Sequence, residues 1–400
     1  MKKIPLLVKV IAAILAGVLL GQIMPDIVIR GMNTLCGVFD QLLRFLIPII
    51  IVGLVTPAIA EVGGRAGKML LLTVVLAYAF TVFSGLFAYV FSSGLFPSVL
   101  PHVSVTAFDA QTADYPAFFT INVPPLMDVM TALVFSFMVG LGIAAFDGPA
   151  LKRGFSEFKT IVSKTIEFVI IPLLPFYIFG IFLNMAAVGQ VAGVLTAFLS
   201  IVAIIFAMTL VLLLLQYGLA GILTHRNPLR LLRTMLPAWF TALGTASSAA
   251  TIPVTLRQAL RNRVSEPVAS FVVPLCATIH LSGSTLKITS CAIALMLMQG
   301  IDFDFPTMLA FIMMLGVTMV AAPGVPGGAI MAALGVLESM LGFDSGQQTM
   351  MITLYIAMDS FGTACNVTGD GAIALIVNRL HKNGIWEISN QEYTGNIIMR

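Results

Sequence analysis

The chain has 400 residues, of which 59% are hydrophobic and only 10% are charged, and its net charge is +3. Soluble domains carry about a quarter of their residues as charged side chains, so a water-facing surface over the whole molecule is excluded. The near-neutral charge gives no sign of a nucleic acid partner. The four cysteines lack metal-ligand spacing and are expected to be reduced structural thiols.

Long apolar segments recur along the chain and predict membrane-spanning helices. A span needs about 20 mostly apolar residues, whose backbone groups must be hydrogen-bonded within the segment. No charged residue or histidine occurs from Phe168 to Thr224, a stretch long enough for two spans. In chain order we expect eight spans, at residues 5–24, 39–61, 69–95, 126–146, 160–187, 193–223, 266–295 and 346–378.

Two further apolar segments, 232–256 and 307–340, are interrupted by Gly, Pro, Ser and Ala. Arg flanks the first on both sides and Asp flanks the second. Basic residues favour cytoplasmic loops, so the first segment is predicted to enter and leave from the cytoplasm and the second from outside. Two such re-entrant hairpins of opposite sidedness indicate inverted repeats with a binding site near the membrane midplane. The alternative is two ordinary spans with weak helix breakers.

The distribution of charge along the loops predicts the topology. Lys and Arg cluster after the second, fourth, sixth and eighth spans, whereas the opposite loops carry mainly Asp. The positive-inside rule then places both termini in the cytoplasm. We therefore expect an all-α polytopic protein of the cell (inner) membrane, with the lipid bilayer as its surroundings.

The tips of the two predicted hairpins are candidate binding elements. The first tip, 244–253, contains Ser247 and Ser248 among small residues, and half-helix N-termini there would offer free N–H groups to an anion. The second tip, 321–329, contains Pro-Gly-Val-Pro-Gly-Gly, which cannot continue as a helix. It is interpreted as a lid, with a plain external turn as the alternative.

Polar residues inside the last two spans point to solute binding. His280 and Lys287 lie in the seventh span, where a lysine is costly and a proton-carrying histidine is as plausible as a structural one. Gly283 is expected to break that span. In the eighth span four polar residues are spaced to line one helix face, and their oxygens suit a hard cation or an ammonium group: Asp359, Thr363, Asn366 and Asp370.

These motifs carry a family resemblance. Ser-Ser…Ile-Pro-Val-Thr-Leu-Arg at 247–257, Pro-Leu-x-Ala-Thr-Ile at 274–279, Gly-Val-Pro-Gly at 324–327 and Asp359…Asn366-Val-Thr-Gly-Asp370 follow in order. The chain resembles, over nearly its whole length, the dicarboxylate/amino acid:cation symporters, the family of glutamate and aspartate transporters. The resemblance implies a homotrimer with an elevator mechanism and a coupling cation, Na+ and/or H+, but no other cofactor.

The resemblance also implies a division of the chain. Spans 1 and 2 (1–64) and spans 4 and 5 (126–190) would form a fixed scaffold. Span 3 with its external loop (65–125) and the segment 191–382 would form the moving transport domain, followed by a cytoplasmic tail at 383–400.

Site roles follow from the same resemblance. Asp359 is expected to bind the substrate α-ammonium. Thr363 and Asn366 are the neighbouring polar ligands that the resemblance implies, with Asn366 near the α-carboxylate of the substrate. The implied substrate site is completed by Ser247, Ser248, Ser284, Lys287, Val325, Pro326, Gly327 and Gly362. The implied cation sites use Asp370 with the backbone of Cys276 and Asn366, and Tyr78 with Thr81.

Two departures from the family pattern leave the coupling ion and the substrate open. His280-Leu281-Ser282 stands where the family usually has Asn-Met-Asp, so a sodium-binding carboxylate is missing and His280 is a candidate proton carrier. Gly362 stands where acidic-substrate transporters have an Arg. Lys287 either supplies the missing cation from span 7 or replaces a lost sodium ion.

The sequence thus predicts a symporter for an acidic or small neutral amino acid. A cation-independent exchanger or uniporter and a C4-dicarboxylate carrier are alternatives, and an anion channel is a remote one. No protease or metal-ligand motif favours an intramembrane enzyme.

Overall fold

The computed structural model of the protein describes residues 6–62, 68–100, 115–146, 148–189, 191–322 and 327–382. These residues form helices and connecting loops, with no strand among them. In chain order the helices are α1 (Leu6–Gly21), α2 (Asp26–Val62), α3 (Lys68–Val99), α4 (Val129–Phe146), α5 (Pro149–Thr165), the π-helical turn η2 (Ile166–Ile170), α6 (Ile171–Ala187), α7 (Val191–Thr224), α8 (Pro228–Thr245), α9 (Ser248–Arg261), α10 (Glu266–Ile279), α11 (Ser282–Met298), α12 (Phe305–Ala321), α13 (Gly328–Leu341), α14 (Ser345–Ala357) and α15 (Asp359–Lys382).

Several of these helices are long and apolar enough to cross a membrane. Within the described residues five stretches meet both criteria, in α2, α3, α5–α6, α7 and α10–α11. Large apolar side chains are exposed along α1, α2, α3, α4, α6 and α7, including Leu19, Leu35 and Ile222. In water such a surface would be unfavourable, so the chain is a multi-pass membrane protein whose apolar exterior faces lipid.

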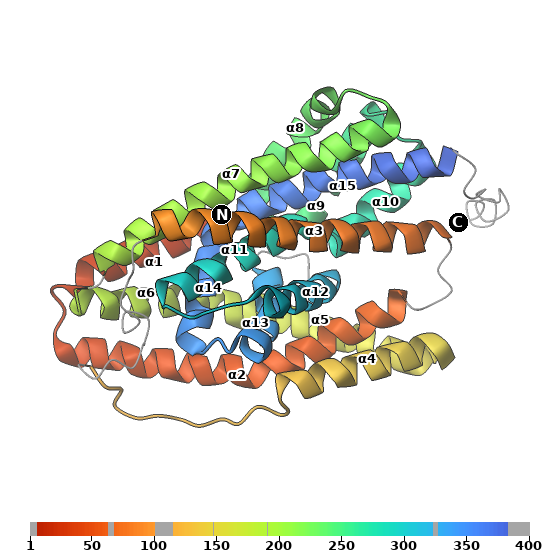
Figure 1. The fold of residues 1–400 in the computed structure, drawn as a ribbon. Helices are drawn as coiled ribbons and strands as arrows, with labels where there is room; N and C mark the ends of the chain where they lie inside the picture. The colour runs from red at the N-terminus through yellow and green to blue at the C-terminus, as the bar shows by residue number, and fades with distance from the viewer. Residues whose placement is uncertain are drawn as a thin grey trace, which may run out of the picture.

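The helices pack into two groups. The first joins α1 with α6, and α2 with α4, α5 and α6. The second joins α3, α7–α11 and α15, with α12–α14 packed beside α11. Figure 1 shows α2 and α4 along one side of the molecule, α7 and α15 along the opposite side, and α11–α14 between them. Residues far apart in sequence therefore meet at the centre, where α10–α11 is almost wholly buried.

Each interrupted segment forms two helices that pack against each other, α8 with α9 and α12 with α13. Local capping explains where several of these helices begin. Asn227 accepts a hydrogen bond from the backbone of Arg230 at the start of α8, and Ser247 does the same for α9. Asp304 caps α12, and the hydrogen bonds that this exposed carboxylate accepts from Thr307 lower its pKa.

The structure corrects three details of the predicted spans. The prediction that a span begins at residue 39 was wrong, because α2 begins at Asp26 and carries Asp40 within it. The predicted continuous span 346–378 is two helices, with Met358 between α14 and α15. The seventh span breaks at His280 and Leu281, not at Gly283, because these two residues adopt non-helical backbone angles.

Candidate functional site

Two helix breaks meet at the centre of the molecule. Asn366 on α15 accepts a hydrogen bond from the Gly283 N–H in the first turn of α11 (2.8 Å). The approach is close: a Cβ added at Gly283 would lie 2.5 Å from the Gly362 carbonyl oxygen and 2.7 Å from Cys365 Cβ. The breaks free backbone groups and let polar side chains from α10–α11 and α14–α15 face one another.

A histidine and an aspartate form the first buried pair. His280 Nδ1 lies 2.9 Å from Asp370 Oδ1, and both side chains are inaccessible to solvent. Within the described chain, His280 Nε2, Asp370 Oδ2 and the Gln216 side-chain oxygen are buried without a hydrogen-bond partner. Gln216 on α7 uses its amide nitrogen to donate to Ser282 (3.2 Å). Unpaired buried polar atoms are costly, so this cluster is suited to holding a further proton, water or small cation.

A lysine and an aspartate form the second buried pair. Lys287 Nζ lies 3.5 Å from Asp359 Oδ1 and donates to the Met358 carbonyl oxygen at 3.3 Å. The same ammonium lies 3.7 Å from the centre of the Tyr355 ring, a cation–π contact. The second oxygen of Asp359 accepts a hydrogen bond from the Gly327 N–H at the tip of α12–α13 (2.9 Å). The ion pair therefore links α11, α15 and the hairpin tip.

A neutral polar network lies beside the Lys287–Asp359 pair. Asn366 donates from its amide nitrogen to Ser284 (3.3 Å), and the Ser284 and Tyr355 hydroxyls are 2.9 Å apart. Ser284, Tyr355 and Asn366 are buried. The predicted polar face of α15 thus points at α11 and α14, and its four residues lie at successive turns beside the two charge pairs.

The other residues predicted for the site are placed as follows. Ser248 and Thr363 are buried, and Ser247 caps α9. The Cys276 carbonyl oxygen accepts from the His280 N–H (2.8 Å). Val325 and Pro326 lie outside the described residues.

Tyr78 and Thr81, which were predicted for a second cation site separate from Asp370, lie on α3. The Tyr78 hydroxyl donates to the Met313 carbonyl oxygen on α12 (3.1 Å), and Thr81 donates to Ala77 within its own helix (2.8 Å). Among the described residues neither hydroxyl hydrogen-bonds to His280 or Asp370. Instead Phe80 presents its ring edge-on to His280, with centroids 6.1 Å apart.

Several residues of the site were missed by sequence reasoning. Tyr355 lies four residues before Asp359, so the helical i, i+4 rule would have placed it on the same face. Gln216 lies in an uncharged span with no local signal. On the far side of α14, Tyr177 hydrogen-bonds to both Asp40 and Thr349, and so joins the two helix groups.

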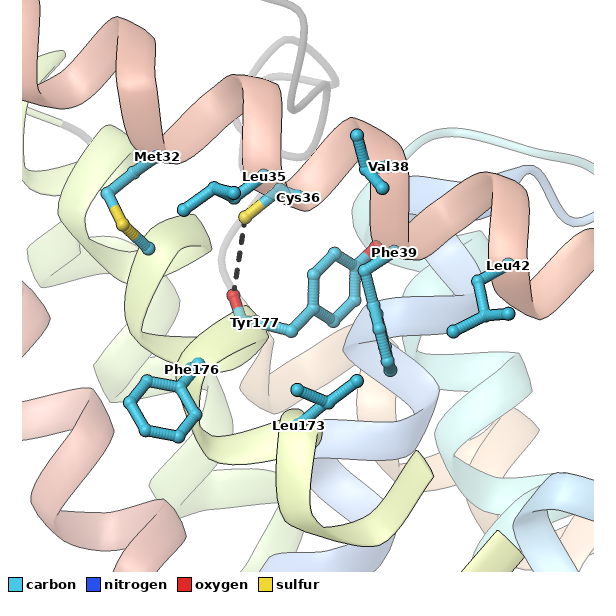
Figure 2. A pocket seen from close by; sticks show the side chains of 9 residues that line it. All are labelled: Met32, Leu35, Cys36, Val38, Phe39, Leu42, Leu173, Phe176 and Tyr177. Carbon is cyan, nitrogen blue, oxygen red and sulfur yellow. Dashed lines mark hydrogen bonds between the residues drawn. The ribbon is translucent and has the colours of Figure 1, made fainter. Parts of the chain in front are cut away.

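A large pocket lies elsewhere, between α2 and α6. Its volume is about 350 Å³, and its lining includes Met32, Leu35, Phe39 and Phe176. Figure 2 shows apolar side chains around it, with the Cys36 thiol directed at the Tyr177 carbonyl oxygen. No charged side chain lines this pocket. It therefore does not match a charged solute, unlike the two buried ion pairs.

The described chain is all-helical, with an apolar exterior and opposite charges buried where two helices break, which defines a multi-pass membrane protein with a polar centre. The family model of the sodium:dicarboxylate symporters ("Sodium:dicarboxylate symporter family") matches residues 6–380, and the chain belongs to that family. The family resemblance predicted from the motifs is thereby confirmed.

One relative is a Caenorhabditis elegans protein named "Putative sodium-dependent excitatory amino acid transporter glt-4". It is 26% identical over 286 residues, which cover 70% of this chain and 57% of the relative. The chain therefore spans little more than half the length of that relative.

Proposed function

We propose that this protein carries an amino acid across the cell membrane in symport with a cation. The observation that supports the proposal is the position of Asp359, a carboxylate at a helix break that accepts a hydrogen bond from the Gly327 N–H and lies near the polar residues Thr363 and Asn366. A carboxylate so placed binds an ammonium group, and the amide and hydroxyl beside it bind a carboxylate. Acidic and small neutral amino acids both carry this pair of groups. In this proposal the protein is a carrier and not an enzyme.

The mechanism proposed is an elevator with eight spans and two re-entrant hairpins. The first helix group, α1, α2 and α4–α6, corresponds to the scaffold at 1–64 and 126–190. The second group corresponds to the transport domain at 65–125 and 191–382. The proposal includes a homotrimer built through the scaffold, with both termini in the cytoplasm.

The coupling cation is proposed to be a proton held by the His280–Asp370 pair. The pair is buried and only 2.9 Å apart, so protonating His280 creates an ion pair in place of an uncompensated carboxylate. The groups that face His280 are Asp370 from α15, Gln216 from α7, Phe80 from α3 and the Cys276 carbonyl from α10. Sodium is the competing cation, because Asp370 Oδ2 and the Gln216 oxygen are hard oxygen ligands without a partner.

A thermal-shift screen of the purified protein tests the substrate class. L-aspartate, L-serine and succinate are compared with and without sodium at two pH values, because a ligand of the folded state raises its stability as occupancy rises. We expect stabilisation by an amino acid in the wild type and at least about ten-fold weaker binding in Asp359→Asn, which removes the charge that holds the ammonium. Stabilisation by succinate alone, unchanged in Asp359→Asn, would show a dicarboxylate carrier instead.

A further inference from the structure

Lys287 is a fully buried basic residue in the described part of the chain. Its side chain is fully buried on α11, and its ammonium is held by Asp359, the Met358 carbonyl oxygen and the Tyr355 ring. A lysine placed among apolar helices costs several kcal/mol unless its charge is paired. The contacts therefore describe a position built for an ammonium group.

The position exists because Gly362 has no side chain. A Cβ at Gly362 would run into the Lys287 Cε and Nζ atoms, so the ammonium occupies the space where another residue would place its first carbon. The lack of a side chain at Gly362 therefore leaves the space that the end of the Lys287 side chain occupies.

Each carboxylate oxygen of Asp359 has a partner within the protein. One oxygen pairs with the Lys287 ammonium and the other accepts from the Gly327 N–H at the hairpin tip. An amino acid whose ammonium bound Asp359 would take the place of Lys287 on that carboxylate. The lysine and the substrate ammonium therefore compete for one partner.

We propose that Lys287 is a built-in counter-ion for Asp359, which neutralises this carboxylate when no substrate is bound. This inference rests on the proposed carrier function and deepens it. With Lys287 in place, Asp359 keeps both its ion pair and its hydrogen bond from the Gly327 N–H, and the empty carrier returns without a charge left unpaired in the membrane. When an amino acid binds, its ammonium takes Asp359, and its carboxylate is available to the displaced lysine.

The consequence is that net transport and exchange depend differently on Lys287. Exchange keeps a substrate in the site during every crossing, whereas net uptake requires the empty carrier to return. Removing one partner of a buried ion pair is strongly destabilising, because it leaves the other charge uncompensated. The penalty for losing the lysine charge therefore falls mainly on the return of the empty carrier.

The test uses the full chain in proteoliposomes with radiolabelled L-aspartate and L-serine in parallel. Net uptake is measured into substrate-free vesicles and exchange into vesicles preloaded with the same amino acid. We expect the ratio of net uptake to exchange to fall at least about ten-fold in Lys287→Met. Lys164→Met, the same substitution at an exposed position on α5, is the matched control and keeps the wild-type ratio.

A second variant keeps Lys287 but is expected to displace its ammonium from Asp359. Gly362→Ala places a methyl group against Lys287 Cε and Nζ and is expected to lower the same ratio, whereas Gly94→Ala, with open space around the added carbon, is not. This variant decides the matter if Lys287→Met does not fold. An unchanged ratio, or a parallel loss of both fluxes, overturns the inference while leaving the carrier function intact. Absence of both fluxes in the wild type overturns the carrier function and the inference with it.

Discussion

Asp359 and Asp370 lie on the same face of α15 but have different partners. Asp359 pairs with Lys287 and Asp370 with His280. The spacing of the polar residues on α15 was sufficient to predict that they line one face. The pairing itself could not be predicted, because it depends on where α10 ends and how α11 is turned toward α15. Position 281 gave no breaker signal, yet it ends the preceding helix with its neighbour His280.

At the residue scale, the prediction for His280 concerns the coupling ion. His280→Asn keeps a polar side chain but cannot be protonated, so uptake should lose its response to a pH gradient while still equilibrating substrate. In the wild type, uptake should rise as the external pH falls, because the proposed mechanism takes a proton from the outside onto the His280–Asp370 pair. The measurement is initial uptake of L-aspartate into proteoliposomes at several external pH values and constant internal pH. A pH response that survives in His280→Asn would assign the proton to another group.

At the element scale, close helix contact at the site depends on glycine. Gly283→Ala would force α11 away from Gly362 and Cys365 on α15, and overpacking of this kind costs about 1–3 kcal/mol. The midpoint of thermal unfolding in detergent should therefore fall. Gly94→Ala on α3 meets no atom within 4 Å and should leave the midpoint unchanged or raise it, because Ala favours a helix. Equal midpoints for the two variants would show that the α11–α15 contact is not tight.

Sequence patterns predicted most of the helices but not every break between them. The apolar segments located most helices, and Gly, Pro and Ser correctly marked the interruptions that separate α8 from α9 and α12 from α13. The break at Met358 was missed because Ala357 and Met358 are good helix formers and neither Gly nor Pro adjoins them. Contacts between the helix groups could not be predicted from the sequence either, because Tyr177 reaches Asp40 and Thr349 only after three distant helices pack together.

For the whole molecule, α14 makes hydrogen bonds that join the two helix groups. Besides the Tyr177 hydroxyl, Arg44 on α2 donates to Ser345 at the start of α14 (3.3 Å). The loop 115–125 also hydrogen-bonds to α2, through Arg30, Asn33, Thr34 and Gln41, so these contacts would change as well in a sliding movement of one group along the other. Both buried ion pairs lie within the second group. This arrangement supports the proposed elevator, in which the charged centre moves as a unit with its ion pairs intact.

The central claim is cation-coupled transport of an amino acid, and gradient-driven accumulation tests it most directly. Radiolabelled L-aspartate and L-serine are offered to proteoliposomes under an inward proton gradient, an inward sodium gradient, or neither. We predict accumulation above the external concentration under the proton gradient, which disappears when the gradient is collapsed by an ionophore. Uptake that only equilibrates the amino acid under all three conditions would contradict coupled transport, and accumulation driven by sodium alone would contradict the role proposed for His280.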